Sequence, residues 1–490
     1  MATAVLRIVS LDTLGARSVA RPSRGPAIAA AMAVTIFLLE TSRRAVYVHF
    51  ASDEMMNIYW YWEPGTWKVL CANVLFWRKI TRPMAGLYYL PLFHWFGFNP
   101  WPYTVARLVI LLFVSLLLLR LAVRLAGSLT AATLGVTVAL YHPELVGLTH
   151  GGSYIYDILC AGFYFAAFLY YLNRRDSGRR LGLIHCCTFL ALYLAALDSK
   201  EMAVSLPVLI CAYELLEATR GTRKIAVVAK RFLAHAPPVA AAVVITALFI
   251  TFKTYGPNGL AQIDSYHPVF TWARFADSGQ RFLNAIFCTT LFRAWSVLAV
   301  WALLLYAGIR KRNRRLLLLL VWVVVAPLPL NFIPPHGPGC IYILLTGWSI
   351  IVAMAFEALA RRLSHEPLFA WLPERAAVVS LLAVALFYYT NVTAFRHQKM
   401  ARSYFGDGEN TWTVIQQFHN LPFHPPHGSR IVFVNDPFPG GWDTLFIAKL
   451  WWNDRSLQVS LQNLQHLPAS TLASMDYTFD FPQGRLTRLR

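Results

Sequence analysis

Charged residues are scarce in this chain, and acidic residues most of all. Only 14% of its 490 residues are charged, and Lys plus Arg outnumber Asp plus Glu by 44 to 24, for a formal net charge of +20. Soluble domains usually carry about a quarter charged residues. Because 57% of the residues are hydrophobic and the mean hydropathy is +0.48, the composition indicates an integral membrane protein surrounded by lipid.

Several common sequence features are also missing. The seven cysteines form an odd set without paired zinc-type spacing, which argues against a disulfide framework or a zinc knuckle. There is no glycine-rich nucleotide-phosphate loop, so we expect no nucleotide cofactor. The basic residues lie in short runs between apolar blocks, a pattern that suits lipid headgroups better than nucleic acid. No internal repeat is recognisable.

What the chain has instead is a series of long apolar runs. Each approaches the length of about 17 to 25 residues that a bilayer-crossing helix needs. They centre on residues 27–42, 103–123, 128–147, 154–172, 181–197, 202–216, 235–253, 286–309, 315–333, 341–359 and 376–394. The first run follows a basic start without a small-residue cleavage site, so it reads as an uncleaved span. We therefore predict an all-α polytopic membrane protein with about eleven transmembrane helices.

Basic residues fall on every second connection between these runs. Positive loops mark the cytoplasmic side, and here they occur at the N-terminus and at residues 120–124, 173–180, 218–231, 310–315 and 360–363. The pattern predicts a cytoplasmic N-terminal segment (1–26), a transmembrane domain (27–395) and an extracytoplasmic C-terminal domain (396–490). We expect this protein in the inner membrane of a bacterium.

Two segments on the predicted outer side are long. The first outer loop, 43–101, has apolar and aromatic residues at partly helical spacing, as expected of helices lying in the interface. In the tail, "ENTWTVIQQFHNL" has a helical pattern and "GSRIVFVNDPF" reads as a strand ended by Asp-Pro. The tail is predicted to form a small α/β lobe.

Polar residues gather at the predicted outer ends of the helices. Charges at bilayer depth cost about 2.5 to 3.5 kcal/mol each, so several of them on one face indicate a site, although each alone could be an ordinary interfacial residue. They form five clusters: Asp53 with Glu54; Arg82; His142, Glu144 and Asp157; Asp198, Ser199, Lys200 and Glu201; and His336 with Tyr342.

Asp53 and Glu54 suggest two different roles. They could be a solvated acidic pair in the first turn of a loop helix. Alternatively, one is a general base and the other orients an acceptor or helps to hold a divalent metal, for which both are candidates. Lys200 similarly reads either as an ion-pair partner of Asp198 or Glu201 or, with Arg82, as a phosphate contact.

The order of these motifs resembles the GT-C superfamily of integral-membrane glycosyltransferases, over residues 27–395. The chain resembles in particular the branch related to protein O-mannosyltransferases and to the membrane part of transmembrane and tetratricopeptide-repeat mannosyltransferases. The elements that match are an acidic pair after the first span, Arg-Pro, His-Pro-Glu, Ser-Lys-Glu, and a proline-rich outer loop followed by tyrosine.

This resemblance implies a membrane enzyme that transfers a sugar, with inversion, from a polyprenyl-phosphate donor to a hydroxyl on the noncytoplasmic side. The acceptor class stays open between protein, lipid and glycan, and so does a divalent metal, which some relatives use. Asp53 then corresponds to the catalytic base and Glu54 to its partner, with Lys200, Arg82 and His336 facing the donor phosphate. His142, Glu144, Asp157, Ser199, Glu201 and Tyr342 would support them.

The chain also departs from that family. In "HGGSYIYDIL", Asp157 lacks the adjacent arginine, and His336 stands where the outer loop often has an arginine. A tetratricopeptide array is absent, so acceptor recognition would rest on the outer loops or the tail. A transporter or flippase of lipid-linked sugars, or an inactive assembly partner, are the alternative functions.

Overall fold

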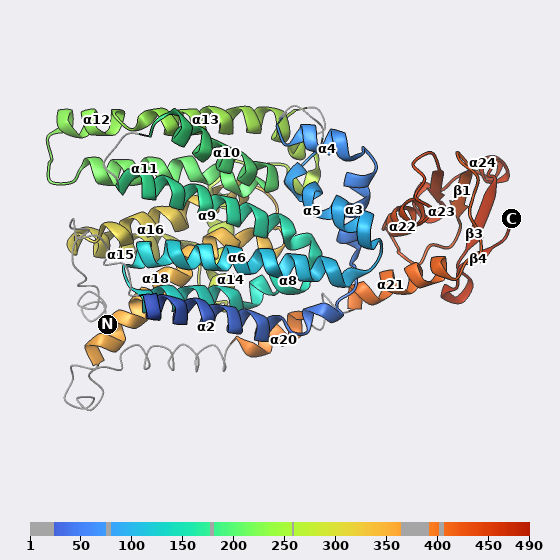
Figure 1. The fold of residues 1–490 in the computed structure, drawn as a ribbon, viewed down its shortest axis with the longest axis horizontal. Coiled ribbons are helices and arrows are strands. Elements are labelled where there is room, and N and C mark those ends of the chain that lie inside the picture. The colour runs from blue at the N-terminus through green and yellow to red at the C-terminus, as the bar shows by residue number, and fades with distance from the viewer. Residues whose placement is uncertain (1–23, 75–79, 177–180, 257–258, 364–391, 401–405) are drawn as a thin grey trace.

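The computed structural model describes residues 24–74, 80–176, 181–256, 259–363, 392–400 and 406–490. Most of them are helical, and the long helices lie side by side along the longest axis of the molecule (Figure 1). A small sheet built by the C-terminal residues stands at one end of this bundle. The predicted combination of a helical bundle and a smaller region with strands is therefore present.

Among the residues that the structure describes, six helical segments are long and apolar enough to cross a membrane: Arg24–Tyr47, Pro100–Ala126, Gly152–Asp176, Ala236–Thr254, Arg314–Asn331 and Gly339–Arg362. Each coincides with a predicted span. The runs predicted at 128–147, 181–197, 202–216 and 286–309 form shorter helices, namely α7 (Leu129–Tyr141), α10 (Leu183–Ser199), α11 (Leu206–Ala218) and α15 (Ala294–Arg310). The run at 376–394 lies almost entirely outside the described residues. The structure supports a membrane bundle, and the total of about eleven spans stays a prediction.

Local sequence signals explain how the bundle helices begin and end. Helix α6 (Pro100–Ala126) starts at Asn99, whose side chain accepts a hydrogen bond from the Trp101 amide, and proline suits the first helical turn. It ends at Gly127, which has the left-handed φ of +73° that glycine tolerates. Ser128 then caps α7 by accepting from the Ala131 amide, so α6 and α7 are joined by a tight turn.

The other helices of the bundle follow the same order as the predicted runs. Their bounds are α2 (Arg24–Ser42), α9 (Ile155–Asp176), α12 (Ile225–Leu233), α13 (Ala236–Phe249), α14 (Trp272–Ile286), α16 (Arg314–Val325), α17 (Leu328–Asn331), α18 (Tyr342–Leu363) and α20 (Thr393–Met400). A π-helical turn, η6 (Ile250–Thr254), extends α13.

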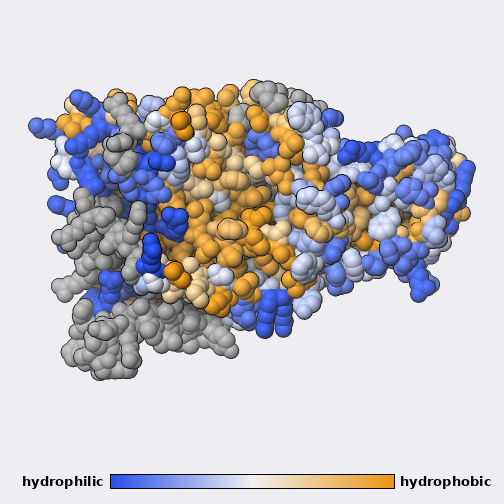
Figure 2. Space-filling view, viewed as in Figure 1, coloured by the Kyte–Doolittle hydropathy of each residue, from blue (hydrophilic) through white to orange (hydrophobic). Residues whose placement is uncertain are grey.

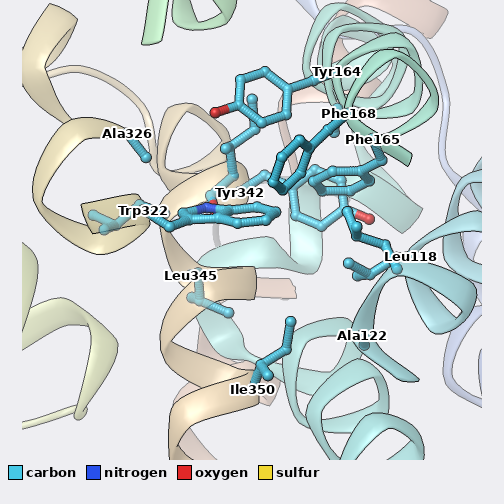
Figure 3. Close-up of a cluster of buried hydrophobic side chains, with 14 of the residues drawn as sticks. Leu118, Ala122, Tyr164, Phe165, Phe168, Trp322, Ala326, Tyr342, Leu345 and Ile350 are labelled. Atoms are coloured by element: carbon cyan, nitrogen blue, oxygen red, sulfur yellow. The ribbon is translucent and has the colours of Figure 1, made fainter. Parts of the chain in front are cut away.

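The centre of the bundle is an aromatic and aliphatic core. Trp322 of α16 is fully buried among Tyr164, Phe165 and Phe168 of α9, with ring centroids 5.8 to 6.1 Å away, and Tyr342 of α18 closes the cluster (Figure 3). The indole nitrogen of Trp322 donates to the Ile343 carbonyl oxygen at 2.8 Å. This satisfies the one polar atom of the largest core side chain.

The basic connections meet at the bundle end opposite the sheet. Arg124 Nη2 lies 2.6 Å from Asp176, Arg314 donates to the Leu216 carbonyl oxygen, and Arg315 donates to that of Ala126. In Figure 2 a broad apolar band separates this hydrophilic end from the polar end that carries the sheet. The band is what a protein embedded in a bilayer requires.

Short helices and the sheet build the end of the molecule opposite to the basic one, which we call the site end. The helices there are α3 (Ser52–Trp62), α4 (Thr66–Ala72), α5 (Gly86–Phe96), α8 (Val146–His150) and, from the tail, α21 (Gly406–His419), α22 (Asp443–Trp451), α23 (Gln462–Gln465) and α24 (Ala469–Ala473). The strands are β1 (Arg430–Phe433), β2 (Gln458–Leu461), β3 (Tyr477–Asp480) and β4 (Thr487–Arg488). The predicted strand coincides with β1, and the predicted tail helix with α21.

The sheet has the order β2-β1-β3-β4. Strand β1 pairs in parallel with β2 and β3, with Val432 opposite Ser460 and Thr478, while β3 and β4 are antiparallel. Apolar side chains of the sheet, such as Phe433 and Phe479, belong to the same buried cluster as Met55 and Ile58 of α3. The tail and the first outer loop thus share one hydrophobic core, and the predicted boundary at residue 396 stays a prediction.

Candidate active site

The Arg82 guanidinium holds the centre of the site end. It binds both Glu201 oxygens, with Nε 3.1 Å from Oε1 and Nη2 2.9 Å from Oε2. Burial alone would lower the pKa of Arg82 and raise that of Glu201, but their attraction outweighs it, so the pKa of Arg82 is raised and that of Glu201 lowered. Both groups therefore stay charged. Arg82 itself has a left-handed φ of 49° directly before Pro83, an uncommon conformation of the kind found at functional sites.

Lys200 forms the second ion pair of the site. It stands at the break between α10 and the 3₁₀ turn Glu201–Ser205, and its Nζ lies 2.7 Å from Oδ1 of Asp157 on α9. Burial lowers the pKa of Lys200, yet the Asp157 carboxylate more than compensates, so the pKa lies above its ordinary value. The sequence pattern predicted pairing with Asp198 or Glu201. The structure selects Asp157, which helix packing brings from a distant part of the chain.

Tyrosines that the sequence analysis missed link these groups. The Tyr61 hydroxyl donates to the Arg82 carbonyl oxygen at 2.9 Å and lies 3.0 Å from the Tyr156 hydroxyl. The Arg82 guanidinium stacks over the Tyr156 ring at 5.4 Å and the Tyr266 ring at 5.8 Å. Tyr156 also lies within electrostatic range of Lys200 and Asp53. In the sequence, the one indication that Tyr156 belongs to the site was its position next to Asp157 in "YIYDIL".

Asp53 and Glu54 face different environments. Asp53 is exposed, whereas Glu54 is buried, because adjacent residues on a helix point about 100° apart. The Ala51 amide donates to Glu54 Oε2 at 3.2 Å, and the Gly152 amide is a second donor. Burial raises the pKa of Glu54, although Arg107 opposes the shift. Glu54 thus ties the start of α3 to the segment before α9 and so positions Asp53.

This divergence bears on the predicted metal site. Two carboxylates that point apart do not form one ligand set. In the part of the chain that the structure describes, no group of three or more His, Cys, Asp or Glu side chains is arranged to hold a metal ion. A divalent metal held by Asp53 or Glu54 stays a prediction, and no step below depends on one.

The tail reaches Asp53 directly. Helix α22 packs along α3, and its first residue, Asp443, hydrogen-bonds Ser52. Burial raises the pKa of Asp443, and the nearby Asp53 charge raises it further. The exposed carboxylate of Asp53 therefore lies where the membrane bundle, the first outer loop and the tail meet.

His336 lies at the edge of the same cluster. Its ring is 4.2 Å from that of Tyr266, and its Nδ1 lies 2.7 Å from the Pro334 carbonyl oxygen. Burial lowers the pKa of His336, and the positive charges of Lys200 and Arg82 lower it further. The fold thus gathers six of the predicted site residues around Tyr156 and Tyr266: Asp53, Arg82, Asp157, Lys200, Glu201 and His336.

The other predicted residues have local structural contacts. His142 Nε2 lies 3.0 Å from the Ile286 carbonyl oxygen, and its Nδ1 accepts from the Glu144 amide at 3.2 Å. The Ser199 hydroxyl donates to the Ala195 carbonyl oxygen, one helical turn back. Tyr342 belongs to the bundle core. Roles for His142, Glu144, Ser199 and Tyr342 in the chemistry stay predictions.

Another cation that the sequence analysis missed supports the Arg82 loop. Lys253, in the π-helical turn η6, donates to the Ile80 carbonyl oxygen at 2.6 Å. Asp198 is fully buried within electrostatic range of it. π-helical turns are often found at functional sites, although the sequence carries no clear signal for one here.

Solved structures of an archaeal oligosaccharyltransferase share this fold. The apo form of the Archaeoglobus fulgidus oligosaccharyltransferase matches with a TM-score of 0.52 at 10% sequence identity, over 89% of this chain and 64% of that chain. The form tethered with an acceptor peptide containing the NVT sequon gives 0.50 at 10% identity, over 91% and 64%.

A third structure, AglB from the same organism in complex with an inhibitory peptide and a dolichol-phosphate, gives a TM-score of 0.50 at 10% identity, over 93% of this chain and 69% of that chain. No protein-family model and no curated protein matches the sequence. The match supports the predicted GT-C fold. This chain spans 64% of the length of the apo oligosaccharyltransferase, and the mannosyltransferase branch stays a prediction.

Proposed function

We propose that this protein is a membrane glycosyltransferase that transfers a sugar from a polyprenyl-phosphate donor to an acceptor hydroxyl. The observation that carries the proposal is a pair of cations at one end of the bundle, half-buried Arg82 and buried Lys200, which surround Tyr156 together with the exposed carboxylate of Asp53. The shared fold supports it, since one of the similar structures holds a dolichol-phosphate. We place the site on the extracytoplasmic face of a bacterial inner membrane, because the basic helix ends lie at the opposite end of the bundle.

In this mechanism Asp53 is the general base. It takes the proton of the acceptor hydroxyl while that oxygen forms a bond to the anomeric carbon of the donor sugar. The bond from that carbon to the phosphate oxygen breaks, and polyprenyl phosphate leaves with the bonding electrons. A single displacement of this kind inverts the anomeric centre and has an oxocarbenium-like transition state.

Arg82 and Lys200 would stabilise the charge that develops on the departing phosphate. Arg82 already donates to Glu201 through Nε and Nη2, but a guanidinium has five N–H donors and an ammonium has three. Each cation can therefore contact a phosphate and keep its carboxylate partner. Those partners hold the cations in place before the donor binds, which is the preorganisation that such catalysis needs.

The test compares membranes containing the wild type, Asp53→Asn or Glu63→Gln, each supplied with a panel of polyprenyl-phosphate sugars. Release of free polyprenyl phosphate is followed by mass spectrometry. Glu63 is the matched control, because it is an acid just beyond the other end of α3 that pairs with Lys449 at 3.1 Å. Loss of a general base usually costs about 10²- to 10⁴-fold in rate. We expect a loss of that size for Asp53→Asn and less than about a twofold change for Glu63→Gln.

Equal release by the wild type and a normally inserted Asp53→Asn variant would refute the role of Asp53. Absence of release with every donor in the panel would refute glycosyl transfer and favour a transporter or an inactive assembly partner. The donor that is consumed would identify the sugar.

A further inference from the structure

A large cleft lies between the first outer loop and the tail, away from the ion pairs of the candidate active site. Its volume is about 1050 Å³, and it is bounded by α3 and α5 on one side and by the end of α22 with the loop that follows on the other. Aromatic side chains form much of its wall: Trp62, Phe93, His94, Phe98 and Trp451. The mechanism proposed above uses none of them.

The polar groups of the cleft are held in fixed positions by one another. Asp454 accepts from the Ser456 amide at 2.8 Å and from the Ser456 hydroxyl at 2.6 Å, and its other oxygen lies 2.8 Å from His427 Nδ1. Arg455 donates from Nε to the Trp62 carbonyl oxygen at 3.0 Å, and its guanidinium lies 4.9 Å from the Trp62 ring centroid. Because the charged groups already have partners, a strongly charged ligand would gain little here.

Trp62 connects the two walls. Its indole nitrogen donates to Asn453 Oδ1 at 3.1 Å, which joins α3 to the loop after α22. The ring of Trp451 packs against that of Phe98 with their centroids 5.5 Å apart, a second contact between the two walls. The cleft therefore combines preformed aromatic surfaces with amide, hydroxyl and imidazole groups, the composition of a site for a ligand with both apolar faces and many hydroxyls.

We propose that this cleft binds a neutral oligosaccharide. A pyranose ring offers an apolar face to an aromatic side chain and hydroxyls to groups such as Asn453 and His427. The volume of about 1050 Å³ lies just above the range of about 300 to 1,000 Å³ for small-ligand sites, so it suits several sugar units better than one. This inference rests on the proposed function in one respect, because only a glycosyltransferase would use the bound glycan as its acceptor.

The position of the cleft agrees with an acceptor site. Trp62 follows Asp53 on α3 by nine residues, which is about 14 Å along the helix axis. A glycan of several units held by the cleft would thus be anchored beside the catalytic helix, with the reacting end of the acceptor outside the cleft itself. Recognition and chemistry would then be separable by mutation.

The test measures binding without any donor. The full chain in nanodiscs is titrated with neutral oligosaccharides of two to six units built from glucose, galactose, mannose or N-acetylglucosamine, and with neutral hexapeptides for comparison. The variants are Trp451→Leu and His94→Ala, which remove cleft surface, and Trp67→Leu as control. Trp67 is 75% exposed on the neighbouring α4 and does not line the cleft.

We expect at least one oligosaccharide to bind, with affinity reduced about tenfold or more by Trp451→Leu, severalfold by His94→Ala and less than twofold by Trp67→Leu. Asp53→Asn should bind as the wild type does, so a failure of glycosyl transfer leaves this result intact. The inference is wrong if no oligosaccharide binds, if the folded His94→Ala and Trp451→Leu variants bind like the wild type, or if only the peptides bind in a Trp451-dependent way.

Discussion

Around Trp322 in the bundle, the neighbouring buried side chains are aromatic or aliphatic, whereas at the site end the buried side chains include Glu54, Arg107, Asp157 and Lys200. In the bundle, the shapes of the side chains determine where they pack, because the attraction between close-packed apolar groups has no preferred direction. At the site end, position follows from paired charges and hydrogen bonds, which are directional and costly to leave unpaired. The comparison explains why the groups suited to chemistry occur at the site end.

Separating Arg82 from Glu201 should cause the largest loss of stability among the changes that test this comparison. Arg82→Met leaves Glu201 without its bidentate partner, and breaking a buried pair costs about 3 to 5 kcal/mol. Since the two side chains are 17% and 22% exposed, we expect a smaller loss of about 2 to 3 kcal/mol in the free energy of unfolding. Thermal unfolding in detergent or nanodiscs measures it.

Two further variants serve as controls for that experiment. Arg82→Met combined with Glu201→Met should recover most of the lost stability, because no unpaired charge is then left. Arg361→Met removes a more exposed partner of Glu357 at the basic end and should cost less than about 1 kcal/mol. If Arg82→Met and Arg361→Met were equally stable, the contrast between the two ends would fail.

A smaller effect should appear on acidification. The pKa of Glu201 is lowered below its ordinary value of 4.5 by Arg82, although burial acts in the opposite direction. An acid with a lowered folded-state pKa contributes stability that is full above the unfolded value and is lost as the pH falls through the folded value. The melting temperature of the wild type relative to that of the Arg82→Met/Glu201→Met double variant should therefore stay nearly constant down to pH 4.5 and fall on further acidification.

Glu54 acts with the opposite sign, because burial raises its pKa. Its contribution favours the folded state at low pH and is lost as the pH rises through the folded value. It is present in both proteins, so it cancels in the difference. A difference in melting temperature that stays constant on acidification below pH 4.5 would contradict the assigned pairing of Glu201.

The smallest expected change in the free energy of unfolding comes from a substitution in the bundle core. The Tyr342 hydroxyl is buried without a hydrogen-bond partner among the described residues, and such a group costs about 1 to 3 kcal/mol. Tyr342→Phe should therefore raise the free energy of unfolding by about 1 kcal/mol and leave glycosyl transfer unchanged. Tyr164→Phe is the matched control, because its hydroxyl accepts a hydrogen bond from Ser205 at 3.3 Å and its loss should be slightly destabilising. A loss of transfer in a stable Tyr342→Phe variant would instead support the predicted role of Tyr342 in the site.

Sequence patterns were most informative where one element decides the outcome. Apolar length predicted about eleven spans, six of which coincide with described helices long enough to cross a membrane. Alternating basic connections predicted that Arg124, Arg314 and Arg315 would gather at one end. Both signals are local, since hydrophobic length and helix-end charge act through the surrounding lipid. The helix and the strand of the tail were also predicted correctly, because their patterns of apolar residues are local too.

The pairing inside the site was less accessible to sequence reasoning. Lys200 has acids on both sides in the chain, yet it pairs with Asp157 of another helix. Asp53 and Glu54 are neighbours in sequence, yet one is exposed and the other is buried against Gly152. Tyr61, Tyr156 and Tyr266 gave no motif, because their role depends on which helices pack together.

The sequence by itself determined that this is a helical membrane protein with basic connections at one end of its helices and mixed clusters of acids and bases at the other, because hydrophobic length and charge distribution suffice for that. Only the tertiary structure decided that Arg82 binds Glu201, that Lys200 binds Asp157, and that the tail shares a core with the first outer loop and leaves a cleft beside it. Such contacts join residues far apart in the chain. Their geometry depends on how whole helices pack, which no local pattern encodes.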